Sequence, residues 1–151
     1  MGRSPDERSD IRVFADVLHV AALMPANGQE QGSAVTPRRR SEKQMIEELE
    51  AGREHLLSAP ASRRLLSLLR QRLQSITRNV YIVCHIPEQY EDLYDILVDG
   101  ATVVHIELPR NASSTEIVFE TSGIQEYLSA HRQISKPDRR RLELALELAQ
   151  R

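Results

Sequence analysis

The segment from residue 80 to residue 86 limits the possible folds of this chain more than any other part. It reads V-Y-I-V-C-H-I, is rich in β-branched residues and contains no acid, Lys or Arg. A short, nearly continuous apolar run of this kind is typical of a strand that is buried on both faces. We therefore expect residues 79–86 to form a strand with helices packed on both sides.

The residues that follow indicate a crossover helix. Pro87 can open a helix, and apolar residues at positions 90, 93, 94, 97 and 98 recur at helical spacing before Asp99-Gly100, which can end it. Residues 102–108 predict a second strand. Since the 14-residue connection from 87 to 100 is long enough for a helix, we predict a βαβ unit with two parallel strands.

A third strand and further helices complete the expected fold. In residues 115–121, Ile117 and Phe119 alternate with glutamates, which is typical of a sheet edge. Helices are expected at 42–57, where Ser41 and Gln44 suggest a capping box, at 61–77, at 124–132 and after Ser135-Lys136-Pro137-Asp138. The predicted class is α+β: N-terminal helices, then the βαβ unit with an antiparallel edge strand in a small mixed three-stranded sheet, then C-terminal helices.

The N-terminal region differs in composition from the rest. Apolar residues at helical spacing after Ser9 and Asp10 predict a helical arm within residues 1–24, and the Pro-, Gly- and Arg-rich stretch 25–40 is typical of a flexible linker. Residues 41–151 then form a single α+β domain.

The composition indicates the cellular compartment in which the protein is expected. Hydrophobic residues make up 40% and charged residues 28% of the chain, and no apolar stretch approaches the roughly 20 residues of a membrane span. The single cysteine, Cys84, cannot form an internal disulfide. We expect a cytoplasmic protein that does not interact with membranes.

Charge is segregated along the chain although the net charge is only -2. Residues 61–78 carry five arginines and no acid, whereas residues 79–100 carry five acids and no Lys or Arg. A basic helix face and a basic linker segment could contact phosphates of a nucleic acid. The candidate phosphate contacts are Arg38, Arg39, Arg40, Arg63, Arg64, Arg70 and Arg72.

A second set of candidates consists of titratable groups on the two predicted strands. His85 and His105 fall near the middles of these strands, and Tyr81 and Glu107 could share their face, so that a His-His-Glu cluster could bind a metal or move protons. Cys84 and His85 are neighbours on a strand and point to opposite faces, which excludes a thiolate-imidazole dyad. The acids of residues 87–100 are expected on the solvated side of the crossover helix.

The C-terminal helix has a wider apolar arc than one packed face requires, which indicates that another element covers it. This cover is either the first helix of the same chain or the equivalent helix of a second subunit. The candidate interaction residues are Phe14 and Val17 on the N-terminal arm, and Leu142, Leu144, Leu146 and Leu148 on the C-terminal helix.

No pattern in the sequence names a reaction. No glycine-rich phosphate loop follows the first strand, and there is no Gly-x-Ser-x-Gly elbow. We therefore predict no cofactor, no metal and no enzymatic activity. The leading hypothesis is a regulatory or adaptor protein that acts through protein-protein association as a homodimer. The alternatives are a nucleic-acid-binding regulator, and a small enzyme or metal protein built around His85, His105 and Glu107.

Overall fold

The structure is a computed structural model that describes residues 40–76, 78–111 and 116–151. Its centre is a four-stranded sheet in which neighbours in the sequence are neighbours in space, in the order β1-β2-β3-β4. All three strand pairs are antiparallel. The strands are β1 (Val80–Pro87), β2 (Glu91–Val98), β3 (Thr102–Pro109) and β4 (Val118–Gly123). The fold is therefore α+β with a larger and entirely antiparallel sheet.

The predicted βαβ unit is wrong, because residues 91–98 form the strand β2 and not a crossover helix. The two expected strands are present as β1 and β3, but β2 lies between them and pairs with both. Apolar residues at 93, 94, 97 and 98 fit helical spacing, yet β2 has sheet partners along both sides, and this tertiary context overrides a weak local preference.

The turn between β2 and β3 explains the hairpin. Asp99 and Gly100 have φ values of 51° and 65°, and Ala101 N–H donates to the Val98 carbonyl at 3.2 Å. Positive φ at both central residues is what a tight type I′ turn requires, and Asp-Gly is among its preferred dipeptides. The dipeptide that was interpreted as a helix end is thus the strongest local indication of a hairpin.

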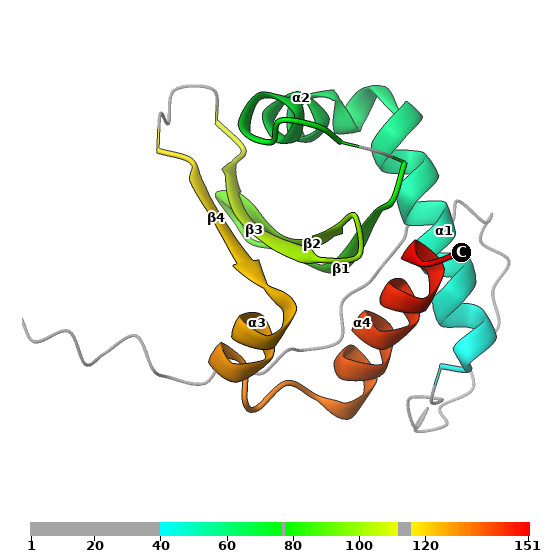
Figure 1. The fold of residues 1–151 in the computed structure, drawn as a ribbon. Coiled ribbons are helices and arrows are strands. Elements are labelled where there is room, and N and C mark those ends of the chain that lie inside the picture. Colours follow the sequence, from blue (N-terminus) through cyan, green and yellow to red (C-terminus); the bar gives the residue numbers. More distant parts are fainter. Residues whose placement is uncertain (1–39, 77, 112–115) are drawn as a thin grey trace, which may run out of the picture.

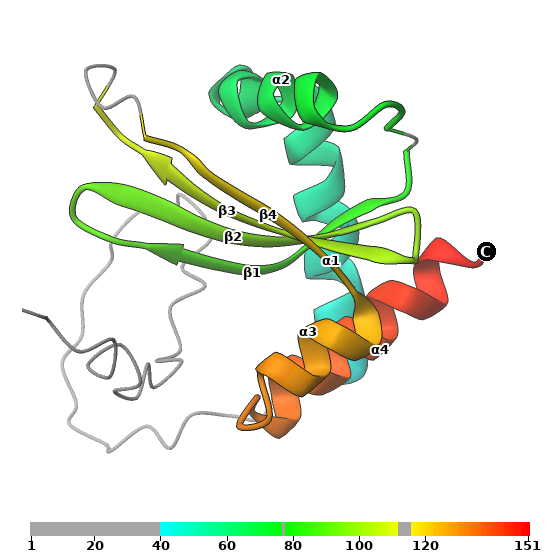
Figure 2. The ribbon, with the colours of Figure 1, turned by 60° about the vertical axis from the view of Figure 1, so that its left-hand side comes forward.

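Helices cover both faces of this sheet (Figure 1). One face is covered by α2 and the other by α3 and α4, while α1 runs along the β1 side (Figures 1 and 2). The helices are α1 (Glu42–Ser58), the 3-10 turn η1 (Pro60–Ser62), α2 (Arg63–Arg72), α3 (Ile124–Ala130) and α4 (Lys136–Ala149).

Local signals account for two helix starts. Ser41 and Gln44 form a complete capping box at the start of α1, in which each side chain binds the other residue's backbone N–H. At the start of α4, the Ser135 side chain accepts from the Asp138 N–H, and proline occupies the first turn. These side chains satisfy N–H groups that have no partner within the helix.

Two apolar clusters fill the space between helices and sheet. Leu69 of α2 packs with Ile106 of β3 on one face, and Leu142 of α4 packs with Leu97 of β2 on the other. Helix α1 contributes Leu49 to the α4 side and Leu56 to the α2 side. One helix therefore joins both cores past the β1 edge, while β4 forms the opposite edge of the sheet, as its glutamates predict.

The apolar arc of α4 is covered within the same chain. Leu142, Leu144 and Leu148 are buried in the cluster shared with α1 and the sheet, and Leu146 packs against that cluster while partly exposed. Phe14 and Val17, with the whole predicted N-terminal helix, lie outside the described residues.

None of the helices in the described ranges is long and apolar enough to span a membrane.

Candidate functional site

The helix α2 presents an arginine face, defined here as Arg63, Arg64, Arg70 and Arg72. Leu65, Leu66, Leu68 and Leu69 of the same helix are buried against the sheet, and all four arginines are exposed. Arg63 and Arg70 lie opposite the leucines, whereas Arg64 and Arg72 reach the sheet. Arg64 Nη1 donates to the carbonyl of Pro109 at the end of β3. The Arg72 guanidinium lies 6.0 Å from the centre of the Phe119 ring on β4.

The arginine face has no carboxylate partner among the described residues, where every ion pair involves other side chains. The helix itself contains no acid. Exposed guanidinium groups that have no carboxylate partner can form forked hydrogen bonds with carboxylates or phosphates of another molecule.

Two of the three arginines of α4 are bound to carboxylates. Arg140 Nε donates to Glu42 at 2.8 Å, and Arg141 Nη1 donates to Glu48 at 2.8 Å. Both contacts join α4 to α1. Arg40 also lies 3.6 Å from Glu48, so this candidate phosphate contact is engaged within the chain, while Arg38 and Arg39 lie outside the described residues.

An exposed aromatic side chain lies at the same end of the sheet as Arg64. Tyr90, in the turn between β1 and β2, is 70% exposed, and its carbonyl accepts from the Arg110 N–H at 2.8 Å. Arg110 directly follows Pro109, the residue that Arg64 contacts. Tyr and Arg are enriched among the residues that dominate binding at protein interfaces.

The predicted His-His-Glu cluster does not form, because His85 and His105 lie on opposite faces of the sheet. A β-bulge in β1 shifts the register between Ile82 and Cys84. The extra residue inverts the alternation of side chains, so Cys84 pairs with Asp95 on the α4 side and His85 pairs with Tyr94 on the α2 side. The described residues hold no cluster of three or more His, Cys, Asp or Glu side chains arranged for a metal ion.

A different polar cluster forms on the α4 side of the sheet. His105 Nδ1 lies 2.7 Å from Asp95 Oδ1, and the Tyr127 hydroxyl donates to Asp95 Oδ2 at 2.9 Å. Glu107 is farther away, with Oε1 3.6 Å from His105 Nε2. Asp95 is only 5% exposed, so its predicted place on a solvated helix surface is wrong.

The hydrogen bonds of this cluster set its protonation. The bond to Asp95 raises the pKa of His105 above its ordinary value, against the opposing effect of burial. Burial also raises the pKa of Tyr127. The cluster therefore favours the protonated form of the His105 ring beside the carboxylate, and it keeps the tyrosine protonated as a donor to that carboxylate.

His85 belongs to a separate group on the α2 side. Its ring stacks on Tyr94 with centres 4.4 Å apart, and its Nε2 lies 3.4 Å from Asp92 Oδ1. Burial opposes ionisation of Asp92, but hydrogen bonds from Arg110 and His85 outweigh it and lower the pKa of Asp92. This group is an ion-paired surface cluster at the hairpin end.

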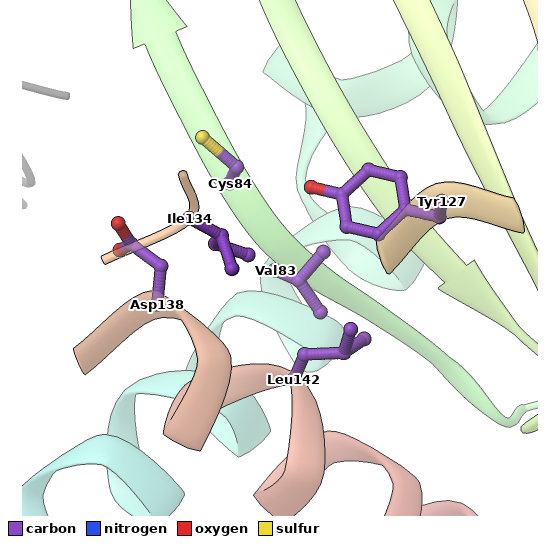
Figure 3. Close-up of a pocket in the computed structure, with 6 residues that line it drawn as sticks. All are labelled: Val83, Cys84, Tyr127, Ile134, Asp138 and Leu142. Carbon is purple, nitrogen blue, oxygen red and sulfur yellow. The ribbon is translucent and has the colours of Figure 1, made fainter. Parts of the chain in front are cut away.

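Cys84 is held as a neutral thiol. Burial raises the pKa of Cys84 to about 12. Cys84 lines a small pocket of about 10 Å³ together with Asp138 and Tyr127, which is room for roughly one water molecule. Figure 3 shows these side chains. Because the thiolate is the reactive form, Cys84 has the properties of a structural cysteine.

Comparisons of this chain with protein-family models, with curated proteins and with solved structures gave no match.

Proposed function

We propose that this protein is a non-enzymatic adaptor or regulator, which associates through the arginine face of α2 with an acidic surface of another protein. The observation that carries the proposal is the contrast between two groups of arginines. Arg140 and Arg141 of α4 are bound to carboxylates of α1, whereas the arginines of α2 have no such partner among the described residues and remain exposed. Complementary charge on a partner gives specificity and fast association.

An acidic protein fits this surface better than a nucleic acid does. Tyr90 is the one large hydrophobic side chain that is strongly exposed in the described ranges. Binding of single-stranded nucleic acid relies on several aromatic side chains that stack successive bases, while one tyrosine beside arginines suffices as an anchor at a protein interface.

The chemistry of the titratable groups supports a non-enzymatic role. Cys84 is a protonated thiol, and both carboxylate oxygens of Asp95 already accept hydrogen bonds from His105 and Tyr127. His85, which would be needed for a two-histidine site, lies on the other face of the sheet. The enzyme alternative is therefore the least supported of the three hypotheses.

The proposal is tested by charge reversal. The double variant Arg63→Glu/Arg70→Glu reverses the arginine face, and Arg132→Glu/Arg139→Glu makes the same charge change at exposed arginines elsewhere. In quantitative capture from the native cell extract, partners should bind the wild type and the control but not the α2 variant. Equal capture by all three proteins would show that the arginine face is not the interface.

Nucleic-acid binding remains the second candidate, because phosphates also match the arginine face. Fluorescence anisotropy with a labelled DNA duplex and a single-stranded RNA at two salt concentrations decides it. Binding that weakens steeply with salt, and that the α2 variant alone loses, would favour this candidate. Absence of binding at low salt would eliminate it.

A cytoplasmic location and a homodimer stay predictions of the sequence. The dimer was inferred from the wide apolar arc of α4, which α1 and the sheet cover within one chain. Sedimentation at tens of micromolar tests it directly, and a monomer would contradict it.

A further inference from the structure

A cavity of about 150 Å³ lies beside the Asp95 cluster, on the sheet face that α3 and α4 cover. Its lining includes Cys84, Ile86, Leu93, Asp95, His105 and His131. The cavity thus lies between the strands β1, β2 and β3 and the residues that follow α3. The pocket is partly open to solvent, and its volume matches that of a cavity known to accept benzene, so it suits a molecule of one small ring.

The polar groups of the lining have defined hydrogen-bonding roles. His131 Nδ1 lies 2.9 Å from the carbonyl oxygen of Tyr127. Because a carbonyl only accepts, Nδ1 carries a hydrogen, and in this tautomer Nε2 is an acceptor. The Asp95 carboxylate is also an acceptor. The side chains of Ile86 and Leu93 form the apolar part of the lining.

The charges around the cavity select against ionic ligands. The Asp95 carboxylate would repel an anion, and an ion of either sign would lose hydration against the apolar side chains of Ile86 and Leu93. A ligand with no net charge avoids both the repulsion and the loss of ionic hydration. It must nevertheless offer a hydrogen-bond donor, since otherwise the His131 acceptor would be desolvated without a partner.

We propose that this cavity binds a small uncharged ring compound that carries one hydroxyl or N–H donor, with the ring against Ile86 and Leu93 and the donor toward His131. The site is independent of the arginine face, which lies on the other side of the sheet. It adds a ligand-binding function to the proposed role in protein association.

Phenol and toluene provide the decisive pair of probes, because they have the same size and differ only in the donor. Each is titrated into the full-length protein while the NMR signals of the Leu93 methyl groups and the His131 ring are followed. Phenol should bind saturably and about tenfold more tightly than toluene, as one hydrogen bond allows. Equal affinities, or signal changes that avoid both residues, would overturn the proposal.

Two variants with matched controls locate the site. Ile86→Trp fills the cavity and should abolish phenol binding, whereas Ile117→Trp makes the same change at a half-buried position on the α2 side. His131→Phe removes the acceptor and should reduce phenol affinity about tenfold without weakening toluene, while exposed His55→Phe changes neither. Phenol binding that Ile86→Trp leaves intact would contradict the assignment. Thermal unfolding confirms that each variant is folded, and the comparison of the two probes in the wild type stands without them.

Discussion

His105 Nδ1 lies 2.7 Å from Asp95 Oδ1 across the β2-β3 pair, and Asp95 is the buried partner of the two. The same carboxylate accepts from Tyr127 of α3. A charge placed among core residues requires hydrogen bonds of this kind, because burial without them is strongly unfavourable. The cluster therefore connects α3 to the sheet through polar contacts.

Replacing Asp95 by Asn should destabilise the domain substantially. The amide keeps the shape of the side chain but removes its charge, and its NH₂ group cannot accept from His105 or Tyr127. We expect the free energy of unfolding in urea to fall by about 2–3 kcal/mol. Glu107→Gln is the matched control, since its carboxylate is 3.6 Å from His105, and it should change stability by less than about 0.5 kcal/mol. Equal losses would mean that Asp95 has no special role.

Stability should decrease with rising pH because of His105. Its pKa is raised in the folded protein above the ordinary value of 6.5. The contribution is therefore complete below about pH 6.5 and is lost as the pH rises through the pKa of the folded state. Urea unfolding of the wild type and of His105→Gln should be compared from about pH 6 to about pH 9. The two stability curves should converge toward high pH, and parallel curves would exclude this role for His105.

The two contacts between α4 and α1 should differ in strength. Arg141 has a side chain that is 8% exposed, whereas that of Arg140 is 35% exposed. Glu48→Gln leaves the buried guanidinium of Arg141 without its charged acceptor and should lower the free energy of unfolding by about 2 kcal/mol. Glu42→Gln leaves the more exposed Arg140 with its two other partners, Glu143 and Glu147, and should have an effect below about 1 kcal/mol. Chemical denaturation of both variants measures the two losses of stability. An equal or larger loss for Glu42→Gln would show that exposure does not control the strength of these contacts.

Cys84 should react slowly with thiol reagents in the native protein. Its pKa of about 12, compared with 9.0 for an ordinary thiol, reduces the thiolate fraction near pH 8, by roughly a thousandfold. Modification by a disulfide reagent, followed by absorbance, should be slow in buffer and fast in urea. Rapid modification of the folded protein would contradict the burial of this thiol.

Part of the candidate site was visible in the sequence. The arginines of residues 61–78 stand out because no acid interrupts them. The spacing of the leucines in this segment predicts a helix whose arginines centre on the side opposite the leucines. The contacts of Arg140 and Arg141 with α1 were not visible, since Glu42 and Glu48 lie 98 and 93 residues away in the chain.

The Asp95 cluster could not be found from spacing along the chain. Its members come from β2, β3 and α3, and Asp95 looked like one solvated acid among five. The Asp99-Gly100 dipeptide could have revealed the hairpin and hence the place of Asp95 in a strand. The bulge that separates His85 from His105 left no such sign.

Local patterns by themselves determined the α+β class, the strands β1 and β3, the caps of α1 and α4 and the edge position of β4. These features follow from side-chain alternation and from hydrogen bonds between residues close in sequence, so they are encoded within short windows. Only the tertiary structure decided that residues 91–98 form a strand, that Asp95 is buried beside β3, and which arginines of the described ranges have no carboxylate partner. Those outcomes depend on contacts between segments that are far apart in the sequence. The free energy of such contacts cannot be read from any short stretch of the chain.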